Sequence, residues 1–479
     1  GWLTVAGEML DVVGELREFA EGVRRKFHHV MVCGMGGSSL CPEVLARTFG
    51  QQPGFPELLV LDSTDPDVIA SFDNRIDVER CLFVIASKSG TTTEPNVFYK
   101  FWQDKVKSGE NFVGITDAGT PLVETGREQG FRRIFLNQAD IGGRYSALSY
   151  FGMLPAALMG VEIGALLERA TNQSDIEKAL RLGVTIGECA NAGRDKLTFV
   201  IDPRLATLGV WIEQLIAEST GKEGKGILPV VGEPLSDPSV YSDDRVFVSI
   251  SLGNVTKDIN AKLDALADAG HPIIRRQLSD LYDLGAEFFV WEFATACAGW
   301  RLHINPFDQP NVQEAKDATK ELLAEFSREG RLPDLSPVTT DDNAFEQQLA
   351  AITPGDYVAF LAFVEDTPEV DRKLQEIRTK LRDKTKCATT IGYGPRFLHS
   401  TGQLHKGGPN RGVFFQIGAK DRVDFPIAGE PYTFSILKEA QALGDFRALQ
   451  GRERRVVRID LGDDLLSGLA RLEEQVQSS

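Results

Sequence analysis

The chain has 479 residues, 42% of them hydrophobic, and its 69 acidic and 52 basic side chains give a net charge of −17. A chain of this size can bury large cores and should divide into about three domains. The excess of acid disfavours nucleic acid and anionic membranes as partners, because both are negatively charged. Six scattered cysteines without metal-like pairing, and the lack of any run of 18 apolar residues, predict a cytoplasmic protein with reduced thiols.

Predicted strands and helices alternate over the first 150 residues. An amphipathic helical pattern fills about the first 30 residues, and predicted strands follow at 29–33, 58–61, 81–86, 111–116 and 133–135. Strands that alternate with helices are typical of a parallel sheet covered by helices on both faces. We therefore predict a first α/β domain over residues 1–150.

The rest of the chain repeats this alternation in two further blocks. Residues 151–330 contain predicted strands at 198–201, 246–251, 273–275 and in the segment before Asn305. Residues 331–345 are rich in Pro and Asp and lack periodicity, which predicts a linker. A third α/β domain follows over 346–479, with strands at 357–364, 387–392, 412–417 and 456–461 and helices at 369–382, 435–443 and 465–476.

A hydroxyl-rich loop follows the predicted strand at 81–86. It has the sequence Ser-Lys-Ser-Gly-Thr-Thr over residues 87–92 and precedes a predicted helix. Backbone N–H groups and the positive end of a helix dipole attract anions, and hydroxyls donate hydrogen bonds to a phosphate. The loop therefore predicts a sugar-phosphate site, against the alternative of an ordinary turn with Thr93 as the helix N-cap. The side chains expected to contact the phosphate are Ser87, Lys88, Ser89 and Thr92.

A second glycine-rich loop, Gly-Met-Gly-Gly-Ser-Ser over residues 34–39, also joins a strand to a helix. Asp62 ends the next strand, where a dinucleotide-binding domain would place an acid for the ribose. Ser39, however, occupies the third glycine position of that motif. Two phosphate-type loops at neighbouring strand ends favour one sugar phosphate over NAD, with Gly37 and Ser38 beside the substrate.

Three further segments form a recognisable sequence pattern together with the loops at 34–39 and 87–92. They are Gly-Gly-Arg-Tyr-Ser at 142–146, Gln-Leu-Ile-Ala-Glu-Ser-Thr-Gly-Lys at 214–222, and Asn-Pro-Phe-Asp-Gln-Pro at 305–310 with Lys316 seven residues after Gln309. In this order the five segments resemble the signatures of the glucose-6-phosphate isomerase family. The resemblance implies two sugar-isomerase (SIS) domains with flavodoxin-like αβα layers, followed here by the third α/β domain.

The chain resembles most the isomerase half of bacterial transaldolase/glucose-6-phosphate isomerase fusions. A transaldolase half is absent from the sequence, and whether one precedes Gly1 in a longer protein is left open. The resemblance implies reversible conversion of glucose 6-phosphate and fructose 6-phosphate in glycolysis and gluconeogenesis, through a cis-enediol(ate) and without a metal or organic cofactor. It also allows a homodimer.

The candidate catalytic residues follow from this chemistry and from the resemblance. Isomerisation needs a base that moves a proton between neighbouring carbons, and the resemblance assigns that role to Glu218. Gln214 lies four residues earlier on the same helical face, so both side chains can reach one ligand. Arg144 would stabilise the negative enediolate. By resemblance, Lys316 assists ring opening and Gln309 binds the substrate.

The sequence departs from the family pattern at one position. The family's ring-opening histidine lies shortly after the catalytic glutamate, yet residues 219–270 contain no histidine. His399 lies in a polar, glycine-rich loop after the predicted strand at 387–392, where parallel sheets form sites. We therefore predict that His399, from the third domain or a partner chain, replaces the missing histidine. The alternative is that His399 hydrogen-bonds only within its own loop.

Two other functions stay open at this point. One is an SIS isomerase that acts on a different sugar phosphate, such as an amino sugar or mannose phosphate. The other is a non-enzymatic sugar-phosphate sensor, which would need the loop at 87–92 but not Glu218.

Overall fold

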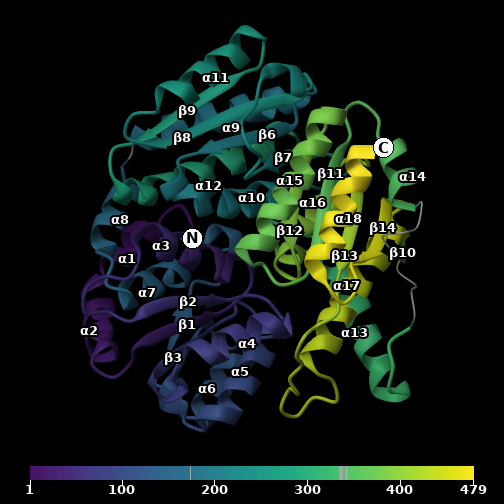
Figure 1. Cartoon of the computed structure of the whole chain (residues 1–479). Helices are drawn as coiled ribbons and strands as arrows, with labels where there is room; N and C mark the ends of the chain where they lie inside the picture. Colours follow the sequence, from purple (N-terminus) through teal and green to yellow (C-terminus); the bar gives the residue numbers. More distant parts are fainter. Residues whose placement is uncertain (173, 334–337, 340–343, 479) are drawn as a thin grey trace.

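A computed structural model of the chain describes residues 1–172, 174–333, 338–339 and 344–478. Its three parallel sheets are flanked by helices, as the sequence predicted (Figure 1). In the view of Figure 1 the first sheet lies at the lower left, the second at the top and the third at the right. None of the described helices is long and apolar enough to cross a membrane.

The first sheet has five parallel strands in the order β2-β1-β3-β4-β5, which is the flavodoxin-like order. Its strands are β1 (His29–Cys33), β2 (Glu57–Leu61), β3 (Cys81–Ala86), β4 (Phe112–Asp117) and β5 (Arg133–Asn137). Every residue of β3 and β4 is buried, which explains their nearly continuous apolar sequence. The helices are α1 (Val5–Leu10), α2 (Val13–Arg24), α3 (Leu40–Phe49), α4 (Pro66–Arg75), α5 (Thr93–Val106), α6 (Pro121–Glu128) and α7 (Tyr150–Leu158), with short 3₁₀ turns η1 (Gly36–Ser38), η2 (Val78–Arg80), η3 (Gly109–Asn111) and η4 (Gly143–Tyr145).

The second sheet has four parallel strands in the order β7-β6-β8-β9. They are β6 (Lys196–Ile201), β7 (Leu228–Val230), β8 (Arg245–Leu252) and β9 (Ile273–Leu278). The helices are α8 (Ile163–Ala170), α9 (Ser174–Asn191), α10 (Ala206–Thr220), α11 (Lys257–Asp268), α12 (Leu284–Arg301) and α13 (Val312–Glu329), with turns η5 (Pro203–Leu205), η6 (Pro238–Val240) and η7 (Leu281–Asp283).

One predicted strand of the second block is wrong. The segment before Asn305 belongs largely to α12, which ends at Arg301. Most residues of α12 are buried, and a helix that is apolar on most of its faces cannot be told from a buried strand by periodicity. The short strand β7, with Pro229 at its centre, was not predicted.

The third sheet has the order β10-β14-β13-β11-β12. Its strands are β10 (Val338–Thr339), β11 (Tyr357–Phe363), β12 (Ala388–Tyr393), β13 (Gly412–Gly418) and β14 (Arg455–Asp460). The helices are α14 (Ala344–Ala350), α15 (Pro368–Thr385), α16 (Gly402–Gly407), α17 (Phe434–Gly451) and α18 (Leu465–Ser478), with the turn η8 (Arg396–His399).

The predicted linker at 331–345 lies partly outside the described residues, which omit 334–337 and 340–343. In its described part, β10 pairs with β14 and α14 begins at Ala344. Helix α13, which the prediction assigned to the second domain, packs against α17 of the third. The domain boundaries at 150, 330 and 346 therefore stay predictions.

The third domain packs against both of the others. One hydrophobic cluster joins Phe98 of α5 to Leu322 of α13 and Phe434 of α17. Another joins Ala217 of α10 to Leu361 of β11. The end of α10, the loop before α5 and the start of α13 are consequently held where the three sheets approach each other.

Candidate active site

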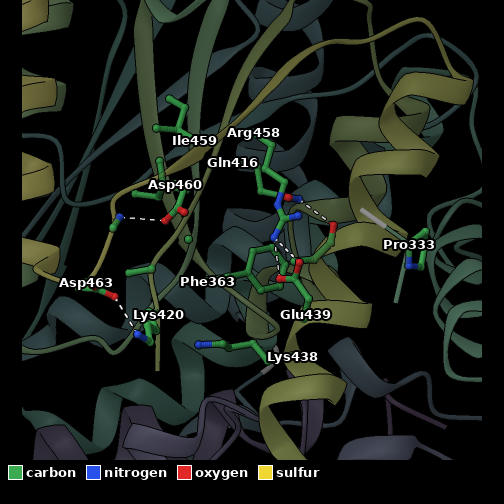
Figure 2. A pocket seen from close by; sticks show the side chains of 15 residues that line it. Pro333, Phe363, Gln416, Lys420, Lys438, Glu439, Arg458, Ile459, Asp460 and Asp463 are labelled. Atoms are coloured by element: carbon green, nitrogen blue, oxygen red, sulfur yellow. Dashed lines mark hydrogen bonds and ion pairs between the residues drawn. The ribbon is translucent and has the colours of Figure 1, made fainter. Parts of the chain in front are cut away.

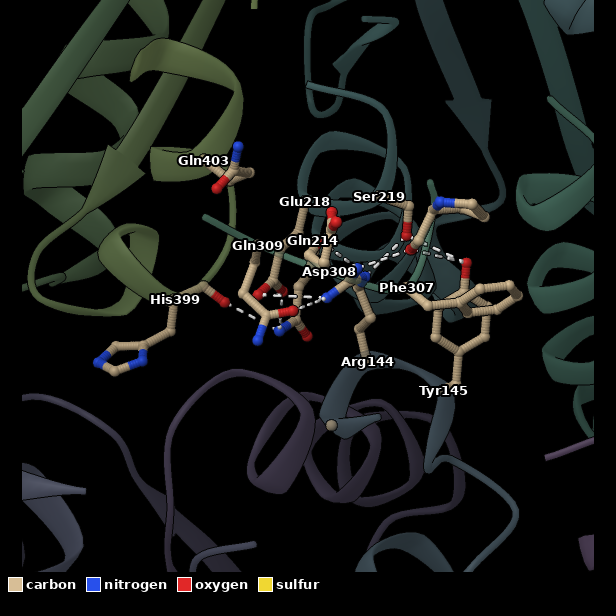
Figure 3. Close-up of polar contacts among 12 residues, drawn as sticks. Arg144, Tyr145, Gln214, Glu218, Ser219, Phe307, Asp308, Gln309, His399 and Gln403 are labelled. Carbon is tan, nitrogen blue, oxygen red and sulfur yellow. Dashed lines mark hydrogen bonds and ion pairs between the residues drawn. The ribbon is translucent and has the colours of Figure 1, made fainter. Parts of the chain in front are cut away.

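Arg144 is the centre of a buried polar cluster (Figure 3). Its side chain is only 3% exposed, and its guanidinium contacts residues from two other segments, the end of α10 and the loop at 305–310. Nε donates to Ser219 Oγ at 2.7 Å, and Nη1 donates to Gln309 Oε1 at 2.9 Å. Nη2 donates to the carbonyl oxygens of Pro306 at 2.6 Å and Asp308 at 2.9 Å. These contacts fix the plane of the guanidinium, because each nitrogen has a partner in a set direction.

Glu218 lies beside this guanidinium on α10. Its Oε1 is 3.4 Å from Arg144 Nη1, and its Oε2 accepts a hydrogen bond from Gln214 Nε2 at 3.0 Å. These two contacts fix the position of the carboxylate, the group that would accept a proton from a bound substrate. Gln214 Oε1 is buried and has no hydrogen-bond partner among the described residues. It is therefore an acceptor available to a ligand hydroxyl.

The glycine-rich loop at 34–39 brings the first domain against this cluster. A Cβ atom on Gly37 would overlap the carbonyl group of Gly143, next to Arg144. Gly36 has a φ of 54°, and a Cβ there would meet Gln214 Nε2 and the His399 carbonyl. Only glycine allows this approach of two loops and α10. Ser38, the other predicted contact of this loop, is buried in η1.

His399 comes from the third domain of the same chain. Its carbonyl oxygen accepts from Gln214 Nε2 at 2.9 Å, and its Nε2 is 3.1 Å from Glu94 Oε1. Burial opposes ionisation of Glu94, but the neighbouring His399 and Lys316 outweigh it and lower the pKa of that carboxyl. Gln441 Nε2 also donates to Glu94 Oε1 at 2.6 Å. The imidazole is thus held by the first residues of α5 rather than by its own loop alone.

A cavity of about 290 Å³ lies next to His399. The hydroxyl residues Ser89, Thr91 and Thr92 line one side, and α13 lines the other. Lys316 and Lys320 of α13 face it, and neither ammonium group has an ion pair among the described residues. Hydroxyls at the N-terminus of α5 opposite two unpaired lysines form a suitable environment for a phosphate.

Two predicted contacts of the loop at 87–92 have other partners in this structure. Ser87 is buried, and its hydroxyl donates to Thr92 Oγ1 at 3.1 Å. The Lys88 ammonium pairs with Asp117 and donates to the Ala139 carbonyl at 2.8 Å. Their contact with substrate stays a prediction, and the charge that faces the cavity comes from α13.

Three positioning residues were missed by sequence reasoning. The buried Lys222 donates from Nζ to Asn305 O at 2.8 Å and Asp308 Oδ1 at 2.7 Å, and so holds the loop at 305–310. Gln403 of α16 donates to Gly221 O at 2.8 Å and accepts from the Asn311 N–H at 2.8 Å. Of these residues, only Lys222 could have been found from the sequence, because it is the last residue of the segment at 214–222 that carries Glu218. Gln403 and Gln441 act across more than 90 and 340 residues of sequence.

The carboxylate of Asp62 is engaged by protein groups and is not placed to bind a ribose. Its carboxylate accepts from Ser39 Oγ at 3.0 Å and from Arg396 Nη2 at 2.7 Å. These partners favour the sugar-phosphate interpretation of the loop at 34–39 over the dinucleotide one. Among the described residues, the carboxylate group with metal-like spacing comprises Asp65, Asp67 and Asp421, and the Lys438 ammonium already bonds two of them.

Comparison with known proteins identifies sequences similar to this chain. The family model for phosphoglucose isomerase matches residues 5–225, a range that includes Arg144, Gln214 and Glu218. A probable glucose-6-phosphate isomerase from Methanococcus maripaludis is 27% identical over 375 residues, covering 67% of this chain and 84% of that protein. A glucose-6-phosphate isomerase from Heliobacterium modesticaldum is 28% identical over 361 residues, covering 62% and 80%. Residues 5–225 of the chain are thus similar to the phosphoglucose isomerase family, and the similarity to individual members extends over about two thirds of the chain.

The phosphoglucose isomerase fold is shared as well. A crystal structure of a glucose-6-phosphate isomerase from Chlamydia trachomatis superposes with a TM-score of 0.55 at 23% identity, covering 66% of this chain and 74% of that one. The predicted resemblance to this family and the predicted α/β fold are thus confirmed. The roles of individual residues are argued below.

Proposed function

We propose that this protein is an isomerase that interconverts glucose 6-phosphate and fructose 6-phosphate with Glu218 as the base. The observation that carries the proposal is the contact of Glu218 with Arg144 and Gln214, beside a cavity with hydroxyls and unpaired lysines. A sensor needs only the phosphate contacts, and the buried pair of carboxylate and guanidinium would have no use in it.

The substrate phosphate binds between the hydroxyls of Ser89 and Thr92 and the ammonium group of Lys316. The sugar carbons then extend past His399 toward Gln214, whose unpartnered Oε1 accepts from a sugar hydroxyl. This path is supported by the contact between the His399 carbonyl and Gln214, which makes the cavity and the Arg144 cluster neighbours. Gly37 and Ser38 close the wall of the site, and Ser87 and Lys88 support the phosphate loop.

The chemical step is a proton transfer between neighbouring carbons. Glu218 takes the proton from C2 of the open-chain aldose, and the electron pair of that bond forms the C1–C2 double bond as the carbonyl oxygen becomes negative. The Arg144 Nη1 group, which here contacts Gln309 and Glu218, is the donor that stabilises this oxygen. The O2 hydroxyl proton then passes to O1, which leaves the negative charge on O2. Protonated Glu218 returns its proton to C1 as the electron pair on O2 forms the C2 carbonyl, and the ketose results.

Ring opening precedes this step and requires proton transfer at the ring oxygen. His399 and Lys316 both line the cavity, and His399 Nε2 lies 3.1 Å from Glu94 Oε1. We propose His399 as the residue that replaces the family histidine, with Lys316 assisting. This assignment makes the site complete within one chain. It is supported by the packing of the third domain on α10 and α5.

The test is conversion of fructose 6-phosphate to glucose 6-phosphate with EDTA present. We expect metal-independent turnover, and a fall in kcat of about 10³-fold in Glu218→Gln, which keeps the acceptor for Gln214 but loses the base. The exposed Glu168→Gln is the matched control and should retain full activity. Full activity of Glu218→Gln would refute its role. Failure of the wild type on this substrate but turnover of another sugar phosphate would retain the chemistry and change the substrate.

The remaining proposals concern the setting of the enzyme. We propose a cytoplasmic enzyme with a small sugar phosphate as its ligand and neither nucleic acid nor membrane as a partner, which the charge of −17 supports. A homodimer and covalent attachment to a transaldolase are further proposals. Light scattering of the purified chain, and the size of the protein in its native cells, test them.

A further inference from the structure

A second cavity lies within the third domain, at the carboxyl edge of its sheet (Figure 2). Its volume is about 400 Å³, and it is lined by the ends of β11, β13 and β14 and by α17. In the order β12-β11-β13-β14 the winding of the chain reverses between β11 and β13. Open α/β sheets bind their ligands at the carboxyl ends of the strands, at this point of reversal.

The cavity has an apolar floor and one buried polar group without a partner. Phe363, Ile459 and Ala442 supply the apolar surface. Gln416 of β13 is 1% exposed, and its Nε2 donates to the Ala442 carbonyl at 3.0 Å. Its Oε1 has no hydrogen-bond partner among the described residues. A buried acceptor is costly to leave unpaired, so a ligand that occupies this cavity should donate to it.

The cations around the cavity are already neutralised. Arg458 Nη2 donates to both oxygens of Glu439 at 2.6 Å, and Lys420 Nζ is 3.1 Å from Asp463. Lys438 pairs with Asp65 and Asp421 (Lys438 Nζ to Asp65 Oδ2, 2.8 Å). A phosphate or carboxylate ligand would have to break one of these pairs. The Asp460 carboxylate accepts from the Gly462 N–H at 2.8 Å and has further capacity to accept.

From these contacts we propose that the third domain binds a neutral, polyhydroxylated small molecule, either a free sugar or a nucleoside. The ligand donates a hydroxyl or N–H group to Gln416 Oε1 and a second hydroxyl to Asp460, and its apolar face lies on Phe363 and Ile459. The volume lies within the range of about 300–1,000 Å³ that is usual for small-molecule sites. This binding site is independent of the isomerase reaction.

Helix α17 connects this cavity with the one beside His399. Lys438, Glu439 and Ala442 lie at the third-domain cavity, while Gln441 of the same helix lines the other one and donates to Glu94. Gln441 Oε1 also accepts from Thr64 Oγ1 at 2.6 Å, which ties α17 to the first domain. The new site therefore lies one helix away from the residue proposed for ring opening.

The experiment is calorimetric titration of the full chain with D-glucose and with adenosine, with saturating fructose 6-phosphate present to fill the isomerase site. We expect one of the two probes to bind, which also decides between sugar and nucleoside. Gly418→Leu should weaken that binding at least tenfold, because a Cβ on Gly418 meets no atom within 4 Å and the added side chain enters the cavity. Gly14→Leu on α2 is the control, since its Cβ is equally free.

A second variant, Gln416→Met, keeps the approximate size of the side chain and removes the acceptor, together with the donor to the Ala442 carbonyl. It should also weaken binding at least tenfold, and it keeps the proposal testable if Gly418→Leu fails to fold. Three results would overturn the proposal: no binding of either probe, equal binding by Gly418→Leu and Gly14→Leu, or binding of inorganic phosphate that both cavity variants abolish. Each is distinguishable from failure of the isomerase assay, which uses a different cavity and different variants.

Discussion

The cavity beside His399 and the cavity at the edge of the third sheet differ in how their charges are arranged. The first lies where three domains meet, and two lysines of α13 face it without an ion pair among the described residues. The second belongs to one sheet and its neighbouring helix, and its cations are paired with nearby acids. The pairing of the charges around each cavity therefore determines which ligands it suits.

The reason for the difference is which elements supply the side chains. In the third domain, α17 and β14 lie next to each other, so Arg458 and Glu439 neutralise each other locally. The cavity beside His399 is formed by a loop of the first domain, by α13 from the middle of the sequence, and by His399 and Gln441 of the third domain. Its excess positive charge is left for a substrate phosphate.

The largest effect that would distinguish the two regions is expected from Arg144→Lys. A lysine has one nitrogen and cannot maintain contacts to Ser219, Gln309 and the loop carbonyls at once. We expect kcat to fall about 100-fold or more in the fructose 6-phosphate assay. The exposed Arg204→Lys, which retains its neighbour Asp202, is the control and should be unchanged. Normal turnover by Arg144→Lys would exclude the guanidinium as the stabilising donor.

A smaller effect is expected from a pair of lysine variants, one in each cavity. Lys316→Met removes a charge that has no ion pair among the described residues and should raise the KM for fructose 6-phosphate about tenfold, since phosphate contacts of this kind contribute about 1–2 kcal/mol. Lys420→Met removes a lysine that Asp463 already neutralises, and the same KM should not change. Steady-state kinetics on both variants measures this. Equal changes in KM for the two variants would contradict the difference in charge pairing between the two cavities.

The smallest effect is expected at Glu94, where α17 and His399 meet the first domain. The pKa of Glu94 is lowered in the folded protein, so its charge stabilises the fold above the unfolded pKa of 4.5. Glu94→Gln should therefore lower the urea midpoint at pH 7, by an amount equivalent to about 1 kcal/mol, and the difference should shrink as pH falls through the folded pKa. A difference that grows on acidification would show that the carboxyl is not stabilised by these partners.

Candidate-site residues could be predicted from the sequence where they lie in the five segments that resemble the family signatures. Arg144, Gln214, Glu218 and Gln309 were named in advance, and the structure brings these four together. Each of these residues lies in a short segment with a distinctive order of residue types, so the segment can be identified from the sequence alone. The strand before Asn305 was wrong because a buried helix and a buried strand have similar composition.

The sequence alone determined the three α/β units, most of their strands, and the loops that end at the carboxyl edges of the sheets. Those features depend on local periodicity and on turn residues, which act over a few positions. Only the tertiary structure decided that Lys88 is neutralised by Asp117, that Gln403 joins α10 to α13, and that the third domain reaches Gln214 and Glu94 through His399. Each of these depends on which distant segments pack together, and local sequence patterns do not contain that information.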